Sequence, residues 1–145
     1  ARVISIIIII NNIITGKGFT LKTGKMATIL SKWLNEEFRL SKSVTNTSLE
    51  EDFSNGYLFG ELLANEFGWI DRKVFTESFK NKSNQDTALT NFFHIAKAMK
   101  EHEINFNRQI MAQVMTEQRG AATAVLLALR ERRAAELLTP REAAR

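Results

Sequence analysis

An acidic helix start, a glycine and a crowded apolar segment follow one another in Asp52-Phe53-Ser54-Asn55-Gly56-Tyr57-Leu58-Phe59-Gly60-Glu61-Leu62-Leu63. Thr47 or Ser48 stands where it can cap a short helix whose first turn is acidic. Gly56 lets the backbone change direction or approach a neighbouring segment where a Cβ would clash. Gly68 stands where a helix C-cap is expected. The stretch therefore predicts a short helix followed by a longer one, joined at a glycine.

The longer of these two helices has one broad apolar face. Its apolar residues recur at helical spacing, which gathers them on one side. They are Leu58, Phe59, Leu62, Leu63 and Phe67. Glu61, Asn65 and Glu66 fall between them and are expected to face water. The pattern indicates packing against a core rather than catalysis.

A helix is also expected before this stretch, from about Thr28 to Leu40. Lys32, Glu36 and Arg39 should face outward on it. Its apolar residues should face inward. They are Leu30, Trp33, Leu34 and Phe38.

Three more segments after Gly68 are expected to contribute helices. A short helix or a wrapped loop is expected over Trp69 to Lys80, with Trp69 in the core. Asn84 should cap a long central helix, and Asn107 should cap a helix through Met115. The apolar stripe of the central helix should be buried, and it comprises Ala88, Leu89, Phe92, Phe93, Ala96 and Met99.

Gly120 should begin the last helix of the domain, which is expected to end near Arg133. Thr139-Pro140-Arg141-Glu142 then has the composition of a new helix start. The sequence as a whole predicts an all-α domain of four main helices with two or three short ones. Its expected limits are residues 26–133, and residues 134–145 would begin a following helical segment or linker.

The run Asp-Phe-x-Asn-Gly-x-Leu-x-x-x-Leu-Leu, placed after a helix that bears Trp33, resembles the calponin-homology domain. Asn84 to Met99 is similar to the long central helix of that family. Ile110 to Thr123 is similar to the end of a variant found in a central-apparatus protein of motile cilia. The resemblance covers Met26 to about Arg133. It implies a non-enzymatic module of the ciliary or flagellar axoneme, in the cytoplasm, that docks on microtubules or neighbouring axonemal proteins.

Charge and composition argue against nucleic-acid and membrane partners. The net charge is +4 and the chain has no cysteine. All 16 acidic residues follow Met26, where they balance 16 of the 20 basic ones, so the expected domain is neutral and a nucleic-acid partner is not expected. Residues 1–25 hold the basic excess and the run Ile6 to Ile10, which is too short to span a bilayer. We expect a non-native or disordered leader there, with Met26 as the natural start, and no membrane partner.

Catalytic and metal-binding side chains are few. His94 and His102 lie too far apart along one helix to share a small ion on their own. Glu50, Glu51 and Asp52 are better explained as first-turn carboxylates that oppose a helix dipole. We therefore expect no enzyme activity, no cofactor and no metal.

Binding by charge is the functional hypothesis. Microtubule surfaces are acidic, so a face that gathers cations would attract them, with an affinity that falls as salt rises. Actin is the competing partner, although calponin-homology domains that bind actin usually work in tandem and no second signature follows. A scaffold or dimerisation domain that uses an exposed apolar patch is the third possibility. The candidate partner-binding residues are Lys32, Arg39, Lys97, Lys100, Arg130, Arg132 and Arg133.

Overall fold

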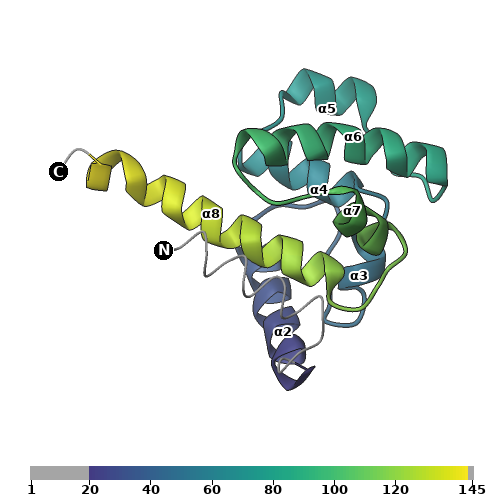
Figure 1. Cartoon of the computed structure of the whole chain (residues 1–145), viewed down its shortest axis with the longest axis horizontal. Coiled ribbons are helices and arrows are strands. Elements are labelled where there is room, and N and C mark those ends of the chain that lie inside the picture. The colour runs from purple at the N-terminus through teal and green to yellow at the C-terminus, as the bar shows by residue number, and fades with distance from the viewer. Residues whose placement is uncertain (1–19, 144–145) are drawn as a thin grey trace.

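The computed structural model describes residues 20–143, with side chains for residues 25–136. Every regular element in this part is a helix, so the predicted all-α class is confirmed. The elements are α2 (Thr20–Glu37), α3 (Leu49–Asp52), α4 (Tyr57–Glu61), the π-helix η1 (Leu62–Glu66), α5 (Arg72–Ser78), α6 (Gln85–Glu101), α7 (Arg108–Met115) and α8 (Ala121–Ala143). The four main helices are α2, α4 continued by η1, α6 and α8. In Figure 1, α8 crosses the molecule with α2 on one side and α4, α5 and α6 on the other.

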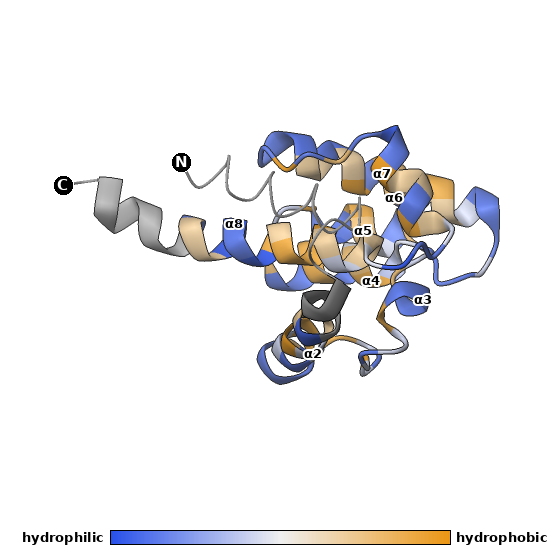
Figure 2. Cartoon of the chain, turned by 60° about the horizontal axis from the view of Figure 1, so that its bottom comes forward, coloured by the Kyte–Doolittle hydropathy of each residue, from blue (hydrophilic) through white to orange (hydrophobic). Residues whose placement is uncertain are grey.

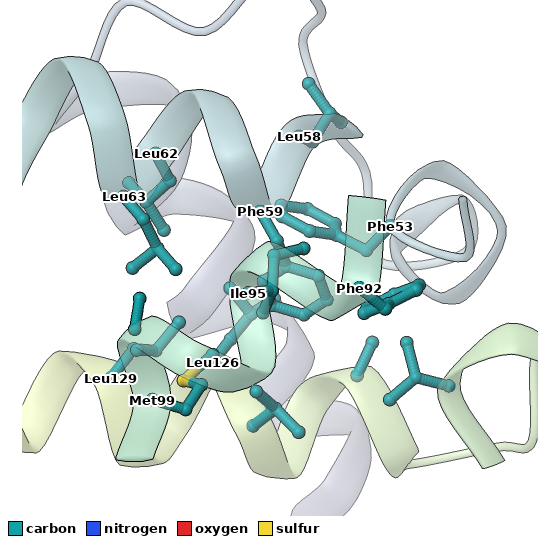
Figure 3. Packing of buried hydrophobic residues seen from close by; sticks show 14 of the residues in the cluster. Phe53, Leu58, Phe59, Leu62, Leu63, Phe92, Ile95, Met99, Leu126 and Leu129 are labelled. Atoms are coloured by element: carbon teal, nitrogen blue, oxygen red, sulfur yellow. The ribbon is translucent and has the colours of Figure 1, made fainter. Parts of the chain in front are cut away.

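The core forms where α4, η1, α6 and α8 meet. Phe53, Phe59 and Phe92 are completely buried at its centre. The ring centroids of Phe53 and Phe59 lie 4.7 Å apart, and those of Phe59 and Phe92 lie 6.1 Å apart. Figure 3 shows aliphatic side chains that complete the packing around them. The predicted apolar face of the signature helix is confirmed, since Leu58, Phe59, Leu62, Leu63 and Phe67 are all buried.

Two glycines of the signature stretch allow this close packing. Gly56 has a φ of +83°, and a Cβ there would lie 3.0 Å from the Cβ of Asn91. Gly60 has no such backbone constraint, but a Cβ would lie 2.2 Å from a ring carbon of Phe79. The first glycine serves the turn into α4 and the close approach of α6, and the second makes room for an aromatic ring.

Glu50 caps α8 from another helix. Its carboxylate accepts hydrogen bonds from the Ala122 amide (2.8 Å), the Gly120 amide (3.3 Å) and the Thr123 hydroxyl (2.7 Å). The first turn of α8 is buried, so these amides have no access to water without that carboxylate. Capping was the predicted role of the acidic residues, but the helix that Glu50 caps is α8 and not its own.

The buried amide of Asn91 ties three segments together. Its Nδ2 donates to the carbonyls of Asn55 and Lys80, each at 2.9 Å, and its Oδ1 accepts from the Lys80 amide at 3.2 Å. Asn91 is completely buried, and these bonds satisfy the backbone of two loops at the point where they meet α6.

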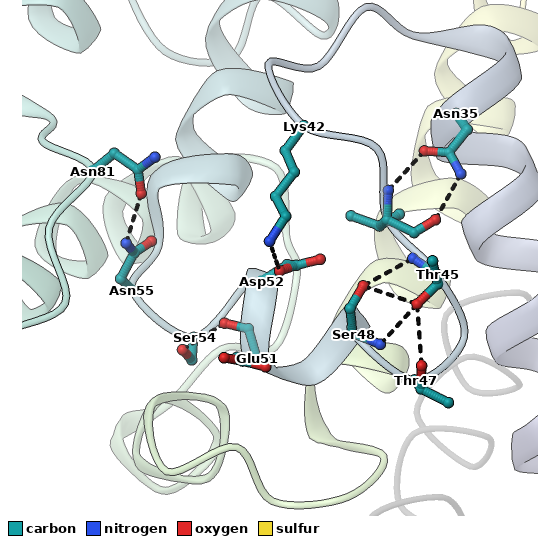
Figure 4. A network of polar contacts seen from close by, with 11 residues as sticks. Asn35, Lys42, Thr45, Thr47, Ser48, Glu51, Asp52, Ser54, Asn55 and Asn81 are labelled. Atoms are coloured by element: carbon teal, nitrogen blue, oxygen red, sulfur yellow. Dashed lines mark hydrogen bonds and ion pairs between the residues drawn. The ribbon is translucent and has the colours of Figure 1, made fainter.

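Side chains also fix the loop between α2 and α3, as Figure 4 shows. Asn35 donates to the Val44 carbonyl (2.7 Å) and accepts from the Val44 amide (2.9 Å). Lys42 pairs with Asp52 at 2.5 Å, and that hydrogen bond, followed by the Asp52 charge, raises the pKa of the Lys42 ammonium. Ser48 precedes α3 as predicted, but its hydroxyl bonds to Thr45 rather than capping the helix.

Both ends of the fold differ from the predicted helix bounds. α2 begins at Thr20 rather than Thr28, so part of the expected leader is helical, while residues 1–19 lie outside the described residues. α2 ends at Glu37 rather than Leu40, because the amides of Arg39 and Ser41 bond to carboxylates of Glu66 and Glu61. The predicted new helix at Thr139 is wrong as well, since α8 continues unbroken to Ala143.

Three burial predictions are wrong. Glu61 was expected in water but is 7% exposed, because its carboxylate turns inward to accept from the Ser41 amide at 2.6 Å. Burial, and then the charge of Glu61, raise the pKa of the Tyr57 phenol. Leu89 and Phe93 were expected in the core but are exposed, because they lie on the side of α6 that faces away from it. Trp69 is buried, as predicted. Among the described residues, no helix is both long and apolar enough to cross a membrane.

Candidate interaction surface on α6

The side of α6 that faces away from the core carries the largest exposed apolar side chain of the described part. Phe93 is 66% exposed and Leu89, one turn earlier, is 44% exposed. Lys97 follows Phe93 by one turn and Lys100 by two, so helical spacing places all four on one side. Asp86 stands two turns before Phe93 on the same side. We call this set the α6 outer face: Asp86, Leu89, Phe93, Lys97 and Lys100.

The core side of α6 explains why these residues are left outside. The residues of α6 that pack inward are Ala88, Asn91, Phe92, Ile95, Ala98 and Met99. Asn91 bonds to the loops at Asn55 and Lys80, and Phe92 packs between Phe59 and Phe106. Phe93 lies about 100° around the axis from Phe92 and so points past that contact. The apolar stripe read from the sequence was wider than the core that receives it.

Lys97 and Lys100 are free cations. Both side chains are exposed, and in the part of the chain whose side chains are described neither forms an ion pair. A hollow lies beside Lys100, between the end of α6 and the loop that leads to α7, where Phe106 and Ala96 contribute apolar surface.

Two arginines of α8, unlike the lysines of α6, are engaged in contacts within the domain. Arg132 lies 3.5 Å from carboxylate oxygens of both Glu103 and Glu136. Arg133 donates to the Phe67 carbonyl at 3.4 Å, and its guanidinium carbon lies 4.9 Å from the Phe67 ring centroid. These two cations stabilise the packing of α8 on the domain. Their charge is therefore less available to a partner than that of a free lysine.

The remaining candidates lie near α2. Arg130 lines a groove between α2 and α8 with Trp33 and Phe38, but Glu37 and Glu131 line the same groove and offset its charge. Lys32 and Arg39 are exposed on the α2 side of the molecule. α2 and α6 lie on opposite sides of α8 in both Figure 1 and Figure 2. The seven candidate cations therefore do not gather on one face. Lys97 and Lys100 adjoin the exposed Leu89 and Phe93, and Lys32 lies one turn from Ile29, which is 50% exposed.

Both histidines pack against aromatic side chains. His94 is partly buried beside Phe79, with ring centroids 5.6 Å apart. His102 stacks on Trp69 at 3.8 Å and pairs with Glu136 at 2.8 Å. Trp69 also donates to Glu136 at 3.0 Å, so one carboxylate holds both rings. No group of three or more potential metal ligands occurs among the described residues.

The helical architecture, with an exposed helix face as its candidate site, defines a small all-α domain. A family model described as "CH-like domain in sperm protein" matches residues 30–131, and the chain belongs to this calponin-homology-like family. The predicted resemblance is thereby confirmed.

The chain is similar to sperm flagellar protein 2 of several mammals. It is 35% identical to the Mus musculus protein, 33% to the Homo sapiens protein and 32% to the Sus scrofa protein, each over 104 residues. The matched region is 72% of this chain and 6% of each relative, so the chain spans a small part of their length. No solved structure matches the chain.

Proposed function

We propose that this domain is a non-enzymatic microtubule- or axoneme-binding module of a motile-cilium protein, and that Lys97 and Lys100 contact the partner. The family and the name of the relatives support a cytoskeletal role in a flagellum. The observation that carries the proposal is the pair of exposed, unpaired lysines on the α6 outer face. An acidic filament surface attracts such a pair over a distance that ionic strength controls.

Co-sedimentation of the full chain with microtubules, at low salt and at about 0.15 M ionic strength, tests the proposal. The domain should pellet with microtubules at low salt and less so at the higher salt. Replacing both lysines in a Lys97→Glu, Lys100→Glu variant should weaken binding about tenfold or more, which corresponds to about 1.4 kcal/mol. Its thermal unfolding should be unchanged because both side chains are exposed.

The matched control carries the same change of charge on the α2 side of the molecule. In a Lys32→Glu, Arg39→Glu variant, the affinity for microtubules should stay within about twofold of the parent. That margin includes the small loss expected from the lower net positive charge. If this variant loses binding and the α6 variant keeps it, the contact lies on α2 and the proposed face is wrong. Absence of microtubule binding in the parent would refute the microtubule proposal itself.

Actin is the alternative partner, and actin filaments belong in the same experiment. Pelleting with actin alone would reverse the ranking of the two filaments. Pelleting with neither would leave the scaffold or dimerisation role, which relies on apolar contact and needs no filament.

A further inference from the structure

We infer that the α6 outer face is a self-association surface, on which two copies of this chain pack their α6 helices antiparallel about a two-fold axis at Phe93. This inference does not rest on the proposed filament contact, and because both contacts use the α6 outer face, a second copy and a filament would compete for it. The occupant of the exposed apolar face is therefore a second copy of the same domain.

The order of chemistry along α6 is self-complementary. Asp86 lies seven residues before Phe93, and Lys100 lies seven residues after it. In an antiparallel pair centred on Phe93, the two aromatic rings meet at the axis and each Asp86 faces the Lys100 of the other copy. Both positions are about 10 Å from the axis along the helix, at 1.5 Å per residue. Isologous contact of this kind satisfies both ion pairs at once.

The positions nearer the axis also suit such a pair. Leu89 faces Lys97 of the other copy, so the aliphatic stem of the lysine covers the leucine while its ammonium stays in water. Thr90 faces Ala96, and these small side chains allow the helices to approach. With Leu89 44% and Phe93 66% exposed, the apolar surface removed from water lies at the centre of the contact and the charges lie at its rim.

The arrangement fits a second copy better than a purely acidic partner. An acidic surface would satisfy Lys97 and Lys100, but it would leave Leu89 and Phe93 uncovered and would repel Asp86. A second copy of α6 provides a contact for all five residues of the α6 outer face. The contact is one helix wide, so the dimer should be weak, with a dissociation constant between about 10 μM and 1 mM.

Sedimentation equilibrium of the full chain over a concentration series up to about 1 mM tests the dimer directly. A concentration-dependent rise from monomer to dimer is expected, and Phe93→Asp should abolish it. A chain that stays monomeric throughout, or a Phe93→Asp variant that dimerises as well as the parent, would overturn the inference.

Charge exchange tests the antiparallel register. Asp86→Lys alone and Lys100→Asp alone should each weaken the dimer at least about fivefold, and the double variant should restore it because each new aspartate again faces a lysine. If the double variant is no better than the single ones, the register is wrong. The double variant would not restore binding to an acidic filament that contacts Lys100, so the two proposals can fail independently.

An introduced cysteine gives a third measurement, because the chain contains none. Two copies of Phe93→Cys meet at the axis and should form an intermolecular disulfide at least about tenfold faster than the exposed control Ala112→Cys on α7. Equal rates for the two variants would contradict a two-fold axis at residue 93.

Discussion

The two sides of α6 differ completely although the same sequence pattern predicts both. Phe92 is fully buried between the rings of Phe59 and Phe106, whereas its neighbour Phe93 is 66% exposed. Asn91 is buried with three hydrogen bonds, whereas Lys97 on the outer side has no ion pair within the described side chains. An apolar residue in a helix is therefore buried only where another element covers it. The uncovered side is then available for a partner.

The largest expected effect comes from the adjacent phenylalanines. Phe92→Ala should lower the free energy of unfolding by about 3–5 kcal/mol, because it leaves a cavity in the centre of the core. Phe93→Ala should change it by less than about 0.5 kcal/mol. Equilibrium unfolding in urea measures both. Similar losses for the two variants would mean that the sides of α6 do not differ as described.

Two adjacent glutamates extend the comparison to α3 and α8. Glu50→Ala should lower the free energy of unfolding by about 1.5–3 kcal/mol, since it removes a charged acceptor from three buried donors at the start of α8. Glu51→Ala, at an exposed position, is the matched control and should cost less than about 0.5 kcal/mol. A stable Glu50→Ala variant would show that α8 does not need a cap from α3.

A third pair compares polar residues on the two sides of α6. Asn91→Ala should cost about 1–3 kcal/mol, because the amide and carbonyl of Lys80 and the carbonyl of Asn55 lose their partner. Thr90→Ala on the exposed side should be nearly neutral. Hydrogen exchange of the Lys80 amide adds a local test, since its protection should fall only in the Asn91 variant.

The smallest expected effect distinguishes the arginines of α8 from the lysines of α6. Arg133→Gln should cost about 0.5–1 kcal/mol through the lost contact with Phe67, and it should leave filament binding within about twofold of the parent. Lys97→Gln should leave thermal unfolding unchanged and weaken filament binding. The opposite assignment of effects would place the contact on α8.

Much of this fold could be predicted from residues close together in the sequence. Asn84 and Asn107 cap their helices as predicted, since each bonds to an amide three residues along the chain. Gly68 adopts the expected positive φ after the signature helix. The glycine motif and the spaced leucines predicted the calponin-homology class, because the turn at Gly56 and the apolar face of the helix after it can both be recognised from neighbouring residues.

What could not be predicted depends on residues far apart in the sequence. Glu50 meets its donors at the start of α8, and Glu61 meets the amide of Ser41, so neither partner is visible from the surrounding residues. Phe93 is exposed because of the width of a contact made by other helices. The exposure of Lys97 and Lys100 followed from their positions on α6, but the engagement of Arg133 with Phe67 required the tertiary structure.

The bonds from Trp69 and His102 to the Glu136 carboxylate restrict the movement of α8. Glu136 lies on α8 beyond the arginines that pack on the domain, and the helix continues from there to Ala143. Bonds from two separate segments to one carboxylate resist both bending and rolling of the helix at that point. Displacing α8 at Glu136 would therefore require the bonds to Trp69 and His102 to break together.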